Sequence, residues 1–113
     1  MTKEVINFED FLKIDMRVGT ILEASINKKA RKPAYVLKID FGSEIGIKQS
    51  SAQITNYTEA ELTNKKIVAV CNFEKKNIAG IESEVLILGS IDEMNLVHLI
   101  SASDEAKNGD HIA

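Results

Sequence analysis

The middle of the chain alternates apolar and polar positions with a period of two residues, which is typical of a half-buried β-strand. The apolar residues at odd-numbered positions from Tyr35 to Phe41 share one face, and Lys38 lies on the other. Because neighbouring side chains of a strand point to opposite faces, we expect the odd-numbered set to face the core. The segment 67–71 is instead continuously apolar, which indicates a strand buried on both faces.

Other parts of the chain predict further short elements. Asn7 can cap a helix over 8–13, and Thr58 with Glu61 forms a capping box that predicts a second helix. A hairpin turn is expected at 41–44 and a polar loop at 75–82. The remaining apolar runs predict strands at 16–26, 45–49, 85–88 (buried on both faces) and 96–100.

The order of these elements favours an all-β fold with short helices. Three strands, a short helix and then two or three more strands suit a five-stranded Greek-key barrel of the OB type, whose helix lies between the third and fourth strands. A β-sandwich would need more strands and turns. The length of 113 residues argues for a single domain, 1–113. We expect 1–15 to be an N-terminal helical extension and 90–113 a C-terminal extension.

Composition narrows the class of protein. Apolar residues make up 44% and charged residues 27% of the chain, as in soluble globular proteins. Residues 1–15 contain acidic side chains and no continuous apolar run, so we expect neither a signal peptide nor membrane insertion. Cys71 is the only cysteine, and no Cys/His cluster could hold a metal. We therefore expect a cytoplasmic protein without a metal or cofactor.

The charge is distributed unevenly along the chain. The net charge is −3, yet residues 28–76 contain ten basic and five acidic side chains, a local net of +5. Such a segment can create a basic field on an acidic protein. The alternative, a solvated loop at 28–32 with no partner, is about equally compatible with the charge pattern.

The sequence offers little to catalysis. His98 lies in an apolar strand, where a structural or interface role is commoner, and His111 lies near the terminus. The serines lack the nucleophile-elbow context, and no phosphate-binding glycine pattern is present. We therefore expect no enzymatic activity.

Binding has more support in the sequence. In an OB barrel, the basic loop 28–32 and the pair Lys75 and Lys76 would flank the same face. Hydroxyl and amide donors between them could contact phosphate oxygens or peptide groups. The face contains few aromatic residues for base stacking. Either a folded RNA or a polypeptide is therefore a suitable ligand.

The segment from Phe11 to Ile21, with Lys13, Asp15 and the run Arg17-Val18-Gly19, resembles the opening signature of the tRNA-binding-domain family. That family includes tRNA-binding proteins and domains appended to aminoacyl-tRNA synthetases. The segments 30–35, 45–55 and 83–89 are similar to its CsaA branch, small bacterial export-related chaperones. The resemblance covers nearly the whole chain, about residues 8–113.

The resemblance implies an OB barrel that forms a homodimer and binds polypeptides without catalysis. It also places Ser50, Ser51, Asn72 and Ser83 at strand ends that line the ligand face in the family, and Lys75 and Lys76 in a loop beside it. Where CsaA-like chains commonly have Asn-Phe-Pro-Pro-Arg, this chain has Glu74-Lys75-Lys76 after Phe73. Lysine lacks the bidentate fork of arginine, and Glu74 would repel phosphate. These changes weaken the expectation of tRNA binding more than that of peptide binding.

Two functions remain open from the sequence. The first is a dimeric chaperone that binds unfolded or precursor polypeptides for export. The alternative is a tRNA-binding module acting in trans. For either ligand, the expected site residues are Arg31, Lys32, Lys48, Ser50, Ser51, Gln53, Asn72, Phe73, Lys75, Lys76, Ile78, Ile81 and Ser83. Ordinary core or dimer contact is the alternative for Phe73, Ile78 and Ile81. For the dimer interface we expect Phe8, Phe11, Leu12 and Ile112.

Overall fold

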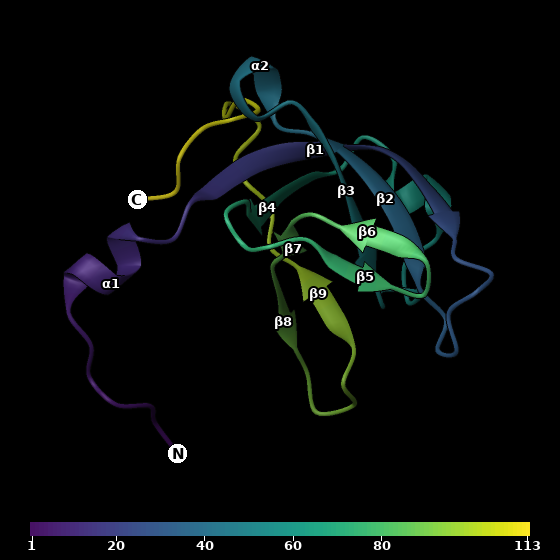
Figure 1. Cartoon of the computed structure of the whole chain (residues 1–113), viewed down its shortest axis with the longest axis horizontal. Coiled ribbons are helices and arrows are strands. Elements are labelled where there is room, and N and C mark those ends of the chain that lie inside the picture. The colour runs from purple at the N-terminus through teal and green to yellow at the C-terminus, as the bar shows by residue number, and fades with distance from the viewer.

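A computed structural model describes residues 1–113 and shows mostly strands with three short helices (Figure 1). Asn7 and Thr58 occupy the N-cap positions of the first and third helices, and Gly46 ends the second. The bounds of the helices are α1 Phe8–Leu12, α2 Gly42–Ile45 and α3 Glu59–Leu62. The strands are β1 Met16–Ile26, β2 Tyr35–Asp40, β3 Ile47–Ala52, β4 Lys66–Val70, β5 Lys76–Ile78, β6 Ile81–Ser83, β7 Leu86–Ile87, β8 Gly89–Ile91 and β9 Val97–Leu99.

The main sheet has the strand order β3-β2-β1-β4-β7, and all its ladders are antiparallel. The long strand β1 pairs with two neighbours, with β4 along its first half and with β2 along its second half. Its register with β2 shifts between Ile21 and Glu23, where a bulge bends the strand. At Gly19 a Cβ atom would lie 2.7 Å from the Phe41 ring, so only glycine allows β1 to approach the core this closely.

The sheet curls until β3 meets the segment that precedes β7. There the Glu84 amide donates to the Gln49 carbonyl at 2.8 Å, and side-chain hydrogen bonds continue the contact. The result is a nearly closed five-stranded barrel, which confirms the predicted all-β barrel of OB type.

The core lies inside this barrel. The side chains of Leu37, Ile39 and Phe41 are fully buried and Tyr35 nearly so, as the alternation predicted. The continuously apolar strand β4 is buried on both faces from Ile67 to Val70, also as predicted. Leu62 of α3 covers one end of the core.

The expected hairpin at 41–44 is present, since β2 and β3 are antiparallel neighbours, but its connection is the helical turn α2, which begins where the Asp40 carboxylate accepts from the Gly42 amide at 2.9 Å. Two other local predictions were wrong. The expected loop at 75–82 contains the hairpin β5–β6, because Ala79 and Gly80 both adopt the positive φ that a two-residue turn needs. The expected strand 85–88 is only β7, and Leu86 is half exposed because just one of its faces meets the core.

The C-terminal segment lies against the barrel, whereas the N-terminal segment points away from it (Figure 1). The C-terminal segment pairs with the first half of β1, where the Ile112 amide donates to the Met16 carbonyl at 3.0 Å and Gly109 to Val18 at 2.8 Å. The helix α1 extends away from the barrel, and the β8–β9 hairpin projects from another side (Figure 1). None of the helices has the length and apolar character needed to cross a bilayer.

Candidate ligand-binding groove

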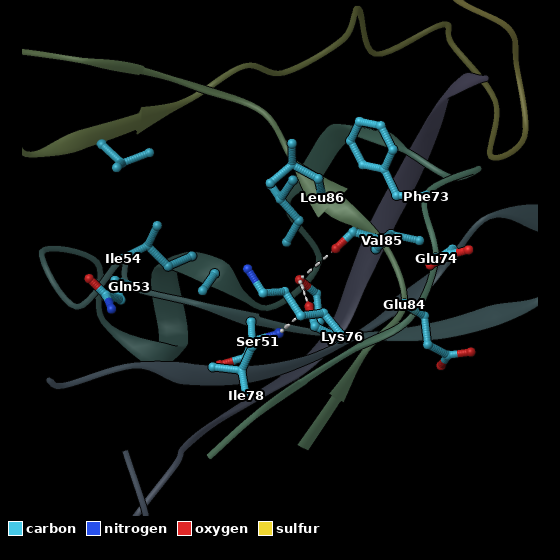
Figure 2. A pocket seen from close by; sticks show the side chains of 15 residues that line it. Ser51, Gln53, Ile54, Phe73, Glu74, Lys76, Ile78, Glu84, Val85 and Leu86 are labelled. Carbon is cyan, nitrogen blue, oxygen red and sulfur yellow. Dashed lines mark hydrogen bonds between the residues drawn. The ribbon is translucent and has the colours of Figure 1, made fainter. Parts of the chain in front are cut away.

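An apolar pocket of about 510 Å³ opens beside the end of β3. The β5–β6 hairpin and the segment from Ser83 to β7 form its other sides (Figure 2). Its volume lies within the range of small-ligand and side-chain pockets, ~300–1,000 Å³. The apolar part of its lining consists mainly of Ile54, Phe73, Val85, Leu86, Ile87 and Val97.

Serine side chains form part of the pocket lining and also hold the barrel closed. The Ser50 hydroxyl is buried and donates to the Val85 carbonyl at 3.1 Å. The Ser83 hydroxyl accepts from the Ser51 amide at 3.2 Å and lies 3.4 Å from Ser50 Oγ. These contacts are drawn in Figure 2. The serines therefore position β3 against the neighbouring segment, and the donor proton of Ser50 is already used.

Three charged side chains also line this pocket: Glu74, Lys76 and Glu84. Glu84 is committed, because its carboxylate lies 3.7 Å from Lys48 Nζ and accepts from the Gln49 amide at 3.1 Å. Glu74 and Lys76 have no oppositely charged side chain within 4.0 Å. These two charges are available to a ligand.

A second, basic pocket of about 370 Å³ adjoins the first. Ser51, Gln53 and Ile78 line both, and Arg31 and Lys32 line only the second. Neither cation has an acidic partner within 4.0 Å. We call the two adjoining pockets together the groove; it joins an apolar hollow to a cationic one.

The groove brings together most of the expected ligand-binding residues, from four separate parts of the sequence. These are Arg31, Lys32, Ser50, Ser51, Gln53, Phe73, Lys76, Ile78 and Ser83. Four others do not line it: Lys48, Asn72, Lys75 and Ile81. Lys48 reaches the site only through Glu84, and the exposed Lys75 lies 4.0 Å from Glu82.

Asn72 has a structural task. Its side-chain carbonyl accepts from the Asp15 amide at 2.9 Å, and its side-chain amide donates to the Lys13 carbonyl at 2.8 Å. The residue therefore ties the segment after α1 to the end of β4. The resemblance to the family had placed it at the ligand face, where it does not lie.

Of the apolar lining, sequence reasoning found Phe73 and Ile78 and missed most of the rest. Val85, Leu86 and Ile87 belong to a segment predicted as a strand buried on both faces, and Ile54 and Val97 were not expected at the ligand face. No local signal indicates that Val97, far along the chain, reaches this pocket.

Two residues of the family signature, Asp15 and Arg17, lie elsewhere, in an ionic cluster around the buried arginine. Arg17 is nearly buried; its guanidinium donates to the Asp15 and Glu44 carboxylates, both at 2.6 Å, and to the Gly109 carbonyl at 3.1 Å. Hydrogen bonds to Asp15 and then Glu44 raise the pKa of Arg17 above its ordinary value, so the guanidinium stays charged. This cluster joins β1, α2 and the C-terminal segment.

The expected dimer residues lie near the two chain ends. Phe8 and Leu12 are 68% and 63% exposed, and the rings of Phe8 and Phe11 stack with centroids 6.1 Å apart. Ile112 is half-buried beside β1. The helix α1 thus presents apolar side chains that its own chain does not cover.

Groups with acid–base or nucleophilic chemistry are scattered. His98 lies on the exposed β8–β9 hairpin, where its Nε2 is 2.8 Å from the Asp92 carboxylate. Burial raises the pKa of the Cys71 thiol to about 11, so this thiol is protonated near neutral pH. No group of three or more His, Cys, Asp or Glu side chains is placed to hold a metal ion.

Comparison with known proteins agrees with this architecture. Residues 16–111 match the family model described as "Putative tRNA binding domain". The chain is 37% identical over 110 residues to the methionine–tRNA ligase of Thermococcus onnurineus, covering 96% of this chain but 14% of that protein. The chain therefore spans about one seventh of the length of this curated relative.

Two solved structures are similar over almost the whole chain. The CsaA chaperone protein of Picrophilus torridus is 56% identical, with a TM-score of 0.91 over 96% of this chain and 100% of that one. The chaperone CsaA of Bacillus anthracis is 50% identical, with a TM-score of 0.91 over 97% of this chain and 100% of that one. The chain therefore belongs to the tRNA-binding domain family and, within it, is similar in sequence and fold to CsaA chaperones.

Proposed function

We propose that this protein is a non-catalytic, dimeric chaperone that binds unfolded or precursor polypeptides in the cytoplasm before their export. The observation that carries the proposal is the apolar pocket of about 510 Å³, lined by Ile54, Phe73 and Val85 beside uncommitted polar groups. A single domain, 1–113, supplies the whole binding surface. Similarity to two CsaA chaperones supports the same function.

The chemistry of the groove suits an extended polypeptide. Apolar side chains of a ligand can enter the pocket, where removing their surface from water stabilises the complex by about 25 cal/mol per Å². Gln53 lies where the two pockets meet and is exposed, so its backbone and side-chain amides are accessible to a ligand. These groups can bond to the main chain of a ligand, which does not depend on the ligand's sequence.

Two isoleucines of the β5–β6 hairpin provide the test. Ile78 and Ile81 face each other across the hairpin, but only Ile78 lines the groove. We expect Ile78→Ser to weaken binding of a labelled unfolded precursor peptide about fivefold, measured by fluorescence anisotropy, because roughly 1 kcal/mol of apolar contact is lost. Ile81→Ser is the matched control and should bind as the unmodified protein does. Equal affinities for both variants would contradict the proposal.

The dimer is proposed from α1. A helix of five residues is too short to be stable alone, so partner contacts are its source of stability. Its exposed Phe8 and Leu12, with Phe11 and Ile112, would form the contact. Sedimentation equilibrium at micromolar concentration should show a dimer, and Phe8→Ser with Leu12→Ser should shift it to monomer. A monomer in the unmodified protein would overturn this part of the proposal.

Binding of tRNA is the second candidate, favoured by the unpaired cations Arg31, Lys32 and Lys76 along one groove and by the family match. If labelled tRNA binds, each neutralised phosphate should add roughly 0.7–0.9 to the slope of log affinity against log salt. Titrations at about 50 and 200 mM salt measure this slope. Lys76→Glu should then abolish binding, whereas Lys75→Glu, outside the groove, should have the smaller effect. Absence of binding at low salt would exclude this candidate.

A further inference from the structure

The groove has opposite charges at its two ends. Glu74 lies beside Phe73 at one end of the apolar pocket, and Figure 2 places it on the side opposite Gln53. Beyond Gln53 the basic pocket begins, with Arg31 and Lys32. One end of the groove is therefore acidic and the other is basic.

These terminal charges are not neutralised by the protein itself. Glu74, Arg31 and Lys32 form no ion pair, whereas Glu82 and Glu84, on the segment that follows β5, each pair with a lysine. Glu84, for example, is bound by Lys48 at 3.7 Å. The charges left for a ligand are thus of one sign at each end.

The stretch between the two ends is apolar with a few hydrogen-bonding groups. Ile54, Val85 and Ile78 supply the apolar contact. The Lys76 ammonium, which lies between the ends in Figure 2, can donate to carbonyl oxygens of a ligand, and the Gln53 amide can pair with its main chain. An extended chain crossing the groove would meet Glu74 first, then an apolar surface that carries the single ammonium of Lys76, and then the basic end.

We propose that the groove selects polypeptide segments by charge polarity. The preferred segment has an apolar centre, a lysine or arginine at the end that meets Glu74, and a carboxylate at the end that meets Arg31 and Lys32. This inference rests on the proposed polypeptide-binding function and adds which segments are bound and in which orientation. Electrostatic complementarity of this kind contributes specificity more than affinity.

A polypeptide fits this arrangement better than a nucleic acid does. An RNA strand carries only negative charge along its backbone, so it would satisfy the basic end and be repelled at Glu74. A polypeptide can present both signs a few residues apart. The acidic end of the groove therefore favours the polypeptide.

The test uses four labelled peptides with one apolar centre and different ends: lysine and glutamate, two lysines, two glutamates, or two glutamines. Because the groove charges are exposed, each matched end should strengthen binding only about two- to fivefold. We expect the lysine–glutamate peptide to bind most tightly, and raising the salt concentration should reduce its advantage. Fluorescence anisotropy gives the four affinities.

Substitutions in the protein test which residues recognise each end of the peptide. Glu74→Gln should remove the affinity gained from a lysine at one end of the peptide and leave the gain from glutamate unchanged. The double variant Arg31→Gln with Lys32→Gln should remove the affinity gained from glutamate and leave the gain from lysine unchanged. Glu93→Gln and Lys28→Gln, at exposed positions outside the groove, are the matched controls and should leave the ranking unchanged.

The outcomes separate the two proposals. If no peptide binds, polypeptide binding itself is overturned, and the polarity with it. If all four bind equally, the polarity alone is overturned. If the Arg31 and Lys32 changes abolish tRNA binding but leave the peptide ranking intact, the basic end serves RNA and the polarity is again overturned.

Discussion

The first half of β1 and the rim of the groove both contain charged side chains, but the charges have different roles in the two regions. Arg17 is buried and bonded to Asp15, Glu44 and the Gly109 carbonyl, so all its hydrogen bonds serve the fold. Arg31 at the rim is exposed and unpaired. A charged group that is removed from water needs partners from its own chain, whereas an exposed charged group is hydrated and remains free to bind a ligand. We therefore expect changes in the first region to alter stability and changes in the second to alter binding.

The largest effect should come from the buried cluster. Arg17→Met should lower the free energy of unfolding by about 3 kcal/mol, because Asp15 and the Gly109 carbonyl lose their donor. The expected loss is at the low end of the range for breaking buried ion pairs, because the Glu44 side chain is 72% exposed and can be hydrated once Arg17 is removed. Urea unfolding measures the change. Lys13→Met, which removes an exposed pair with Asp10, is the control and should cost under about 0.5 kcal/mol.

The same strand offers a test that involves no charge. Gly19→Ala should destabilise the barrel by about 2 kcal/mol, because the new methyl group would meet the Phe41 and Ile39 side chains. Thermal unfolding measures the change. Combining it with Phe41→Leu should cost less than the sum of the single changes, since the smaller side chain makes room. Strict additivity would show that the steric contact is not the cause.

A substitution at the rim of the groove should weaken ligand binding without lowering stability. Phe73 is 55% exposed and lines the apolar pocket. Phe73→Ser should therefore weaken peptide binding about fivefold, equivalent to roughly 1 kcal/mol, and leave the urea midpoint almost unchanged. Ile91→Ser removes a 68% exposed side chain outside the groove and should affect neither measurement. Loss of stability in the Phe73 variant would break the distinction between the two regions.

The smallest effect concerns the exposed Asp92–His98 pair on the β8–β9 hairpin. The hydrogen bond from His98 holds the pKa of Asp92 below its ordinary value of 3.8. A lowered carboxyl pKa stabilises the fold above the unfolded pKa, and the contribution is lost as the pH falls through the folded value. The melting temperature of the unmodified protein should therefore slightly exceed that of Asp92→Asn at about pH 6, and the difference should vanish well below pH 3.8. A difference that grows in acid would contradict this assignment.

Local patterns predicted the elements whose environment is uniform. The strand Met16–Ile26 has the predicted bounds, and the odd-numbered side chains from Tyr35 to Phe41 are buried. The capping box of Thr58 and Glu61 is present at α3. In each case the signal is contained within a few neighbouring residues, as a two-residue period or a cap is.

Predictions were wrong where backbone conformation or a distant contact decided the structure. The β5–β6 hairpin depends on positive φ at Ala79, which a non-glycine residue seldom adopts. Leu86 was expected in the core, but no other strand covers its outer face. Such outcomes depend on what packs against a segment rather than on the segment itself.

Alternation, caps and signature residues are properties of neighbouring positions, so they were enough to predict a β-barrel of the tRNA-binding domain family. The sequence also placed most of the polar and charged groups of the groove. Only the tertiary structure decided that Asn72 ties down the chain after α1, and that Ile54 and Val97 meet in one pocket. The same holds for charge. Arg17 and Arg31 are the same residue type in the sequence. Folding buries Arg17 among hydrogen-bond partners, which makes it structural, and leaves Arg31 exposed and free to bind a ligand.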